Sequence, residues 1–275
     1  MSLALNTASS CPCSCAHALL EPLRAFVRDD ALRAKRVGLT LDSIAGVPGG
    51  TQRHEIARVR LTGAYAGHDP IRLGLFAGIH GDEPAGCAAL VEFTLALAAD
   101  PVRFAGYELF IYPVLNPTGL ASGTRVNHAG KDLNREFWRD SSEVEVQAIE
   151  RELRANEFHG IITLHADDTC EGVYGYAHGR TLNEALLGPA LAAAKRFLPV
   201  DERGVIDGFP ARAGLICDCF AGVLSAPPEQ RPQPFDVIFE TPAHAPFAAQ
   251  VTATVAALDA IIATYPGFIS YAQDL

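Results

Sequence analysis

Hydrophobic and polar residues alternate along this chain with two spacings, one typical of strands and the other typical of helices. Apolar and polar positions alternate from Ile56 to Leu61, which predicts a half-buried strand. Apolar runs predict further strands, which we place at Ile71–Ile79, Tyr107–Leu115, Gly160–Leu164, Val173–Tyr176 and Phe235–Phe239.

Segments with apolar residues three and four positions apart predict the helices that separate these strands. They cover Ala18–Ala34, Pro84–Ala99, Ser141–Asn156, Leu182–Phe197 and Phe247–Thr264. We expect Pro266-Gly267 to end the last helix, since proline lacks the N–H that a helix interior needs. Strands alternating with helices predict the α/β class: a single domain whose mixed, mostly parallel, twisted sheet has helices on both faces.

One large domain fits the length of 275 residues, because the chain has no internal repeat and no linker-like break in composition. Residues 1–15 are predicted to form a flexible N-terminal arm, and residues 16–275 a single domain. Cys11, Cys13 and Cys15 lie in the arm with one residue between neighbours, whereas a zinc ribbon has two, which favours a tail over a metal clip.

The composition excludes several classes of partner. A net charge of −10 and a pI near 5.3 oppose binding to nucleic acid or anionic lipid, and we expect neither partner. We find no apolar run that reaches the roughly 20 residues of a membrane span, and no signal peptide. Seven cysteines, an odd number, do not form a disulfide framework in a chain of this length, so the cytoplasm is the expected compartment.

Two histidines and a glutamate follow predicted apolar strands. His80 and Glu83 come directly after Ile71–Ile79, and His165 comes directly after Leu164. Ligand sites in open α/β sheets form beyond the carboxyl ends of the strands. A tight turn can bring His80 and Glu83 to one ion, and we expect Gly81 to supply an unusual backbone conformation there. Two histidines and a glutamate are typical of a catalytic zinc ion, although each motif alone can equally be structural.

Charged and amide side chains also follow the strand that ends at Leu115. Arg125 comes first, and the Asn134–Arg135 pair follows. The planar guanidinium of arginine suits a carboxylate, but a turn-rich surface loop with solvated arginines is the alternative. Glu240 ends the strand Phe235–Phe239, where an unpaired buried carboxylate would be costly.

In combination these motifs resemble the zinc metallocarboxypeptidase superfamily of zinc exopeptidases, including its succinylglutamate desuccinylase/aspartoacylase and murein-peptide amidase branches. That family has His-x-x-Glu, an Asn-Pro-Asp-Gly turn, Arg-x-Asn-x-x-Gly-x-Asp-Leu-Asn-Arg, a strand-ending His and a late Glu. Asn116–Gly119 matches the turn with Thr in place of Asp, and Arg125–Arg135 matches the long run. The resemblance covers residues 70 to 245.

The resemblance implies one Zn²⁺ ion per chain, with His80, Glu83 and His165 as its ligands. It implies that zinc activates the attacking water, that Glu240 is the general base and then the general acid, and that Arg125 stabilises the oxyanion. The expected enzyme is a zinc metallohydrolase.

Asn134 and Arg135 match the pair that binds the terminal carboxylate of the substrate, so the resemblance implies cleavage of an amide bond beside a free carboxylate in a small peptide. An N-acyl amino acid deacylase and a non-catalytic carboxylate-binding protein are the alternatives. Between Tyr176 and Glu240 the chain lacks the tyrosine of the digestive members, and Ala166 replaces their serine. These departures resemble the side branches, whereas the long Arg125–Arg135 run favours the carboxypeptidase side.

Overall fold

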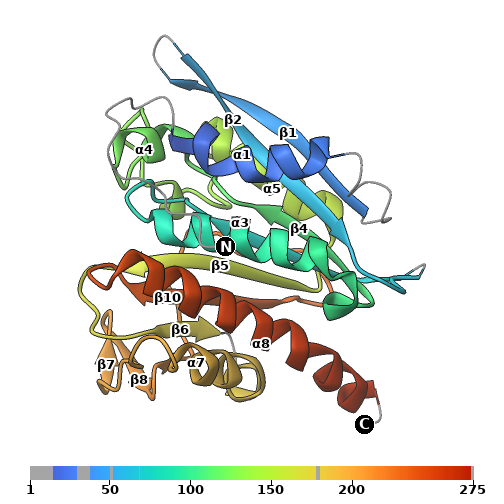
Figure 1. Cartoon of the computed structure of the whole chain (residues 1–275). Helices are drawn as coiled ribbons and strands as arrows, with labels where there is room; N and C mark the ends of the chain where they lie inside the picture. Colours follow the sequence, from blue (N-terminus) through green and yellow to red (C-terminus); the bar gives the residue numbers. More distant parts are fainter. Residues whose placement is uncertain (1–14, 30–37, 50–51, 68, 178–179, 274–275) are drawn as a thin grey trace.

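The computed structural model describes residues 15–29, 38–49, 52–67, 69–177 and 180–273. Within this part of the chain one sheet of ten strands has the order β1-β2-β4-β3-β5-β10-β6-β9-β8-β7 (Figure 1). The strands are β1 Gly38–Gly49, β2 Gln52–Thr62, β3 Ile71–Ala77, β4 Tyr107–Tyr112, β5 Gly160–Asp167, β6 Tyr174–Ala177, β7 Val205–Ile206, β8 Phe209–Arg212, β9 Leu215–Ile216 and β10 Phe235–Pro242.

The four strands at the centre of the sheet run parallel. β4, β3, β5 and β10 pair with one another in that order, while β1, β2 and most of the strands beyond β10 pair antiparallel. The predicted class is therefore confirmed as a single α/β domain with a mixed sheet. Its parallel centre brings the carboxyl ends of β3, β5 and β10 to the same edge.

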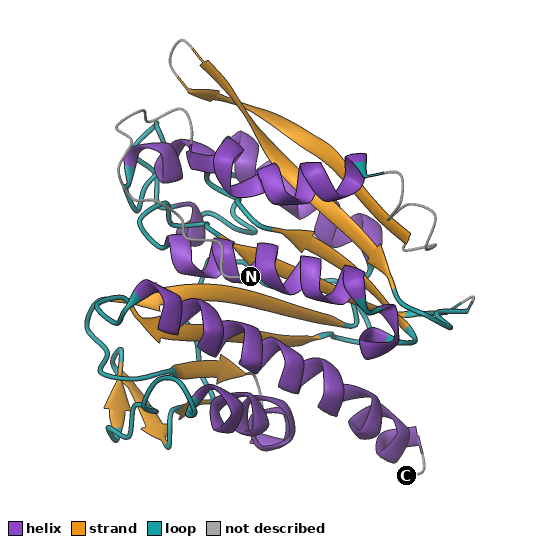
Figure 2. Ribbon diagram, viewed as in Figure 1, coloured by secondary structure: helices purple, strands orange, loops and turns teal. Residues whose placement is uncertain are grey.

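Helices cover both faces of the sheet, as predicted (Figure 2). The helical segments are α1 Cys15–Arg28, α3 Pro84–Ala99, η1 Pro101–Phe104, α4 Pro117–Ser122, η2 Leu133–Arg135, α5 Val144–Asn156, α6 Arg180–Leu182, η3 Asn183–Leu187, α7 Gly188–Ala194 and α8 Phe247–Gln273. One apolar core joins the sheet to α1, α3, α7 and α8, and a second joins its other face to α5.

The predicted end of the last helix is wrong, because α8 continues through Pro266 to Gln273. Proline at this position removes the N–H that would bond to the carbonyl of Ile262, four residues earlier. The hydroxyl of Tyr107 donates to that carbonyl at 2.8 Å. The acceptor that Pro266 leaves free is therefore satisfied from the sheet.

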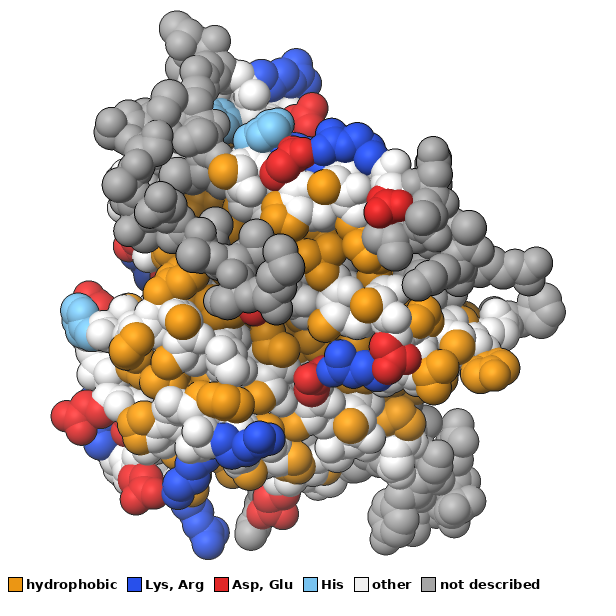
Figure 3. Space-filling model, viewed as in Figure 1, with side chains coloured by type: hydrophobic (Ala, Val, Ile, Leu, Met, Phe, Trp, Pro, Cys, Tyr) orange, Lys and Arg blue, Asp and Glu red, His pale blue; other side chains and the backbone are white. Residues whose placement is uncertain are grey.

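The same helix corrects a second expectation. Phe247–Gly267 has the length and apolar composition of a membrane span, contrary to the sequence prediction that no such run exists. In this fold α8 packs against α3 and α7, and Leu258 and Ile261 on it are fully buried in the core. Hydrophobic side chains are also prominent on the visible surface over α8 (Figure 3).

The other differences between predicted and observed elements lie in segments where apolar residues do not recur at a regular spacing. The long edge strand β1 and the short strands β7, β8 and β9 were not predicted. The predicted helix Leu182–Phe197 is divided into α6, the π-helical η3 and α7, with Pro189 near the start of α7. The predicted N-terminal arm and the end of the first predicted helix lie outside the described residues. The described cysteines Cys87, Cys170, Cys217 and Cys219 are free thiols.

Candidate metal centre and active site

The turn after β3 places His80 and Glu83 beside the sheet edge. Glu83 is the residue before Pro84, which begins α3, so the chain changes direction within a few residues. Gly81 is needed there for close approach: a Cβ atom on it would lie 1.9 Å from the backbone carbon of Gly119. The turn is therefore packed tightly against the first turn of α4. Position 81 therefore requires glycine because of this close approach, and not because of the unusual backbone conformation that we expected.

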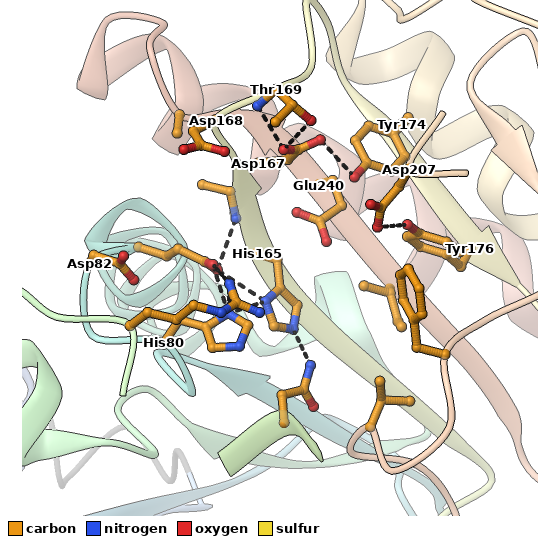
Figure 4. Close-up of a pocket in the computed structure, with 18 of the residues that line it drawn as sticks. His80, Asp82, His165, Asp167, Asp168, Thr169, Tyr174, Tyr176, Asp207 and Glu240 are labelled. Atoms are coloured by element: carbon orange, nitrogen blue, oxygen red, sulfur yellow. Dashed lines mark hydrogen bonds and ion pairs between the residues drawn. The ribbon is translucent and has the colours of Figure 1, made fainter. Parts of the chain in front are cut away.

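Three ligand atoms converge at this edge (Figure 4). The Nδ1 atoms of His80 and His165 lie 3.2 Å apart. The Glu83 carboxylate bridges them, with Oε1 2.7 Å from His80 Nδ1 and Oε2 3.0 Å from His165 Nδ1. All three residues are buried, and their ligand atoms lie within 4.8 Å of one another.

This donor set fits a divalent metal. Two atoms bound to one tetrahedral zinc ion at about 2.0–2.1 Å lie about 3.3 Å apart, close to the separation of the two imidazole nitrogens. Burial lowers the pKa of His165 and so favours the neutral form that binds metals. Burial alone would raise the pKa of Glu83, but His165 and His80 hold it well below its usual range. Burial opposes the charged form of His80 too, but hydrogen bonds to Asp132 and Glu83 raise its pKa, so a metal bound there would displace a proton. The site thus offers two imidazole rings and one ionised carboxylate.

Asp132 orients this cluster from the segment before η2. Its Oδ1 lies 3.2 Å from His80 Nε2, and its Oδ2 accepts from Arg125 Nε at 3.1 Å. Burial opposes ionisation of Asp132, but the hydrogen bond from His80 and the charge of Arg125 lower its pKa. A carboxylate behind a ligand histidine fixes the tautomer and the ring orientation. Asp132 lies within the run Arg125–Arg135 noted in the sequence, but no role was predicted for it.

Asp167 and Asp168 follow closely after His165 in the sequence, where a carboxylate could lie behind its ring. Asp167 instead accepts hydrogen bonds from Thr169 and from the hydroxyl of Tyr174. Asp168 lines the cavity beside the cluster without a recorded contact to His165. Among the described residues, a carboxylate from outside the cluster therefore contacts His80 but not His165.

Glu240 lies on β10 next to the cluster. It is the register partner of His165 on β5 and of Tyr174 on β6. No hydrogen bond from a described residue reaches its carboxylate. Burial raises the pKa of Glu240 well above its usual value, and the nearby carboxylate of Glu83 raises it further. A carboxyl group with a raised pKa holds a proton more readily than an ordinary glutamate, as a group that accepts and returns a proton must.

A single cavity of about 440 Å³ collects every residue that the sequence singled out. These residues are His80, Glu83, Arg125, Asn134, Arg135, His165 and Glu240. Arg125 Nη1 lies 3.3 Å from His80 Nδ1, and half of its side chain is exposed toward the cavity mouth. The structure thus brings together side chains from the ends of three parallel strands and the loop after β4.

The segment Phe220–Leu224 supports the Asn134–Arg135 pair. The Arg135 guanidinium lies over the Phe220 ring, 5.0 Å from its centroid. The backbone N–H of Leu224 donates to Asn134 Oδ1 at 2.8 Å. Gly222 has a φ of +80°, and a Cβ atom on it would lie 2.7 Å from the Arg135 carbonyl oxygen. Both side chains of the pair are therefore held by one loop.

The opposite wall of the cavity holds three residues that sequence reasoning did not select. The hydroxyl of Tyr174 donates to Asp167, and the hydroxyl of Tyr176 donates to Asp207 at 2.8 Å. In Figure 4, Glu240 lies between this wall and His165. Tyr174 and Tyr176 lie in a segment predicted as a strand, but no motif in the sequence marks Asp207.

Known proteins resemble this chain in sequence over part of its length and in fold over most of it. Residues 70–197 match the family described as the succinylglutamate desuccinylase/aspartoacylase catalytic domain. This match includes the three candidate metal ligands, Arg125 and the Asn134–Arg135 pair, but ends before Glu240. No curated protein matches the chain.

Solved structures extend the likeness to most of the chain. A candidate metallopeptidase of Shewanella denitrificans is 27% identical, with a TM-score of 0.73 over 90% of this chain and 89% of its own. A second candidate metallopeptidase, of Shewanella amazonensis, is 25% identical, with a TM-score of 0.72 over 90% of this chain and 92% of its own. A metallo-carboxypeptidase of Burkholderia cenocepacia shares the fold at 18% identity, with a TM-score of 0.66 over 90% of this chain and 69% of its own.

These findings confirm the resemblance predicted from the motifs: the chain is similar to the zinc metallocarboxypeptidase-like superfamily in fold and, over residues 70–197, in sequence. Within it, the matched family is the succinylglutamate desuccinylase/aspartoacylase one, and the similar structures are metallopeptidases and carboxypeptidases by description. A hydrolase with a metal site is what the family match and the His-Glu-His cluster support.

Proposed function

We propose that this protein is a zinc-dependent hydrolase that cleaves an amide bond next to a free carboxylate. The observation that carries the proposal is the convergence of His80, Glu83 and His165 in the same cavity as Glu240 and the Asn134–Arg135 pair. A cavity with these groups can hold the carbonyl, the scissile nitrogen and the terminal carboxylate of one small substrate at once.

In this proposal His80, Glu83 and His165 hold the metal, and Asp132 orients His80. A bound zinc ion polarises a carbonyl and makes water acidic enough to attack near neutral pH. The protein contributes a buried set of donors with short internal distances, which few arrangements other than a metal site explain.

Glu240 moves the protons. Its carboxylate accepts a proton from the attacking water and then donates it to the nitrogen of the leaving amine. Its raised pKa suits both steps, since it makes the carboxylate a better proton acceptor than an ordinary glutamate. Arg125 faces the cluster with Nη1 and holds the negative charge that develops on the carbonyl oxygen.

Asn134 and Arg135 select the substrate. The Arg135 guanidinium can form two parallel hydrogen bonds to a carboxylate, and Asn134 adds an amide donor. Because Phe220 and Leu224 already hold these side chains, binding would cost little conformational entropy.

A second candidate function is deacylation of an N-acyl amino acid. It is favoured by the match of residues 70–197 to the succinylglutamate desuccinylase/aspartoacylase family. Both reactions break an amide bond and would use the same protein side chains. They differ in what is removed from the amino acid, which is an acyl group in one reaction and a peptidyl group in the other. The cytoplasm stays our predicted compartment, and small peptides or N-acyl amino acids our predicted partners.

A substrate panel separates these functions. We would incubate the purified protein with C-terminal dipeptides, N-acetyl and N-succinyl amino acids, and γ-glutamyl peptides, each with and without a chelator. We expect chelator-sensitive release of an amino acid from one class. Hydrolysis that a chelator leaves unchanged would contradict the metal-dependent mechanism. Tight binding of these compounds without hydrolysis would favour a carboxylate-binding protein.

A further inference from the structure

A second cavity, of about 300 Å³, adjoins the candidate active site. It shares part of its wall with the first, so the two form neighbouring compartments. The shared residues are Tyr176, Cys219, Val223 and Ile238. None of the residues described as metal ligands or carboxylate binders lines the second cavity.

Strand β10 runs past both compartments. Side chains two residues apart on a strand face the same side, so Asp236, Ile238 and Glu240 form one row. Glu240 lines the first cavity, Asp236 lines the second, and Ile238 lines both. The Cα atoms at the two ends of the row are about 13 Å apart, from the rise of about 3.3 Å per residue. The row therefore leads from the candidate proton carrier in the first cavity to Asp236 in the second, with Ile238 between them.

Asp236 has no described side-chain partner. The backbone of Ala226 is the group that stabilises its charge, and burial raises the pKa of its carboxyl to about 7. The rest of the cavity is largely apolar, with Ala177, Leu182 and Pro234, and Asp218 adds a second carboxylate. Among the described residues that line it there is no lysine, arginine or histidine. The described wall thus combines aliphatic surface with two carboxylates and no basic side chain.

We propose that the second cavity binds the side chain of the amino acid released by the enzyme, and that Asp236 selects an aliphatic side chain ending in an amine. The apolar wall would contact the methylene groups, and the ammonium would pair with Asp236 at the far end. This inference rests on the proposed function, since it assumes that the substrate carboxylate is held at Arg135.

The second cavity favours a cationic group of the ligand beside Asp236 over a carbonyl or carboxylate group. A neutral Asp236 could donate a hydrogen bond to a carbonyl or carboxylate of a ligand. A carboxylate ligand, however, would lie beside Asp218 with no basic side chain among the described residues of the wall. An ammonium group would pair with Asp236 and offset the free energy that burial costs its ionised carboxylate.

A series of substrates tests the inference. We would measure the hydrolysis of N-acetyl amino acids and of N-acetyl-alanyl dipeptides. In each series the C-terminal amino acid would be 2,4-diaminobutyrate, ornithine, lysine, norleucine or glutamate. We expect kcat/KM to rise with the length of the amine side chain, and lysine to exceed norleucine by about 10-fold or more, as for a hydrogen bond to a charged group. In Asp236→Asn the ratio of lysine to norleucine should fall toward one. In Asp236→Glu, whose carboxylate reaches further, the optimum should shift to ornithine. Asp259→Asn, in an exposed pair with Arg103, serves as the control.

A binding measurement separates failure of this inference from failure of the proposed function. Free lysine and free norleucine would be titrated calorimetrically into the protein and into Asp236→Asn. If no substrate is hydrolysed but lysine binds more tightly than norleucine only with Asp236 present, the proposed function fails and the selective cavity stands. If the unaltered protein binds and cleaves norleucine or glutamate as well as lysine, or if Asp236→Asn keeps the preference, the inference is overturned.

Discussion

Glu240 and His165 are register partners on the parallel strands β10 and β5. Paired residues on neighbouring strands project from the same face, about 4.8 Å apart along the hydrogen-bonding direction. The strand pairing therefore fixes the distance between a candidate proton carrier and a candidate metal ligand. This relationship requires no loop to be in a particular conformation.

Glu240→Gln should keep the metal and lose turnover. The amide has the shape of the carboxyl group but cannot accept and return a proton, so we expect kcat to fall by about 10²- to 10⁴-fold. Metal content and kcat would be measured on the same preparation. If the variant retained its metal and nearly full activity, Glu240 would have no part in the mechanism.

Asp132→Asn should weaken metal binding without unfolding the protein. Its Oδ1 lies 3.2 Å from His80 Nε2, and removal of such a partner commonly costs 10- to 100-fold in metal affinity. Competition with a chelator would give the affinity. Asp168→Asn is the matched control, because Asp168 lines the same cavity without contacting a candidate ligand. Equal affinities in the two variants would remove Asp132 from the site.

Phe220→Leu should raise KM for substrates with a free carboxylate by about 3- to 10-fold, which is the range of a cation–π contact. The expected change in kcat is small, because the Phe220 ring lies under Arg135 and not beside the cluster. Phe220→Tyr should restore KM. For a substrate whose carboxylate is converted to an amide, KM should be the same in the unaltered protein, Phe220→Leu and Phe220→Tyr. A fall in kcat with unchanged KM would contradict a positioning role.

Asp236→Asn should change how stability depends on pH. Burial raises the pKa of Asp236 from an ordinary value of 3.8 to about 7, so ionisation costs free energy in the folded state only. The cost is absent below pH 4, grows as the pH rises to about 7, and is bounded by about 4 kcal/mol. Thermal unfolding should therefore give the variant a higher midpoint than the unaltered protein at pH 8 and no such advantage at pH 4. Parallel pH profiles for the two proteins would contradict a buried, ionisable Asp236.

The main features of the fold were predictable because the central strands are apolar on both faces. Pro84–Ala99 was predicted with the bounds of α3, and the strands at Ile71 and Tyr107 begin where the sequence placed them. The end of α8 was not predictable, because the carbonyl freed by Pro266 is satisfied by Tyr107, which is distant in sequence. Edge strand β1 lacks the alternation that marks a half-buried strand.

The site likewise contains residues that the strands place, which were predictable, and residues that contacts between loops place, which were not. His80, Glu83, His165 and Glu240 follow apolar strands, and the parallel pairing of those strands brings them together. Asp132 gained its role from a contact between two loops, which no spacing in the sequence reveals. The wall formed by Tyr176 and Asp207 likewise depends on the turn after β7.

Elemental analysis of the purified protein tests the candidate metal site directly. We would determine bound metals per chain in the unaltered protein and in His165→Ala, with circular dichroism to verify folding of both. The account predicts about one zinc ion per folded chain and a loss of zinc in the variant. A well-folded protein that contains no zinc, and takes up none when zinc is added, would contradict the His80–Glu83–His165 site and the hydrolase built on it.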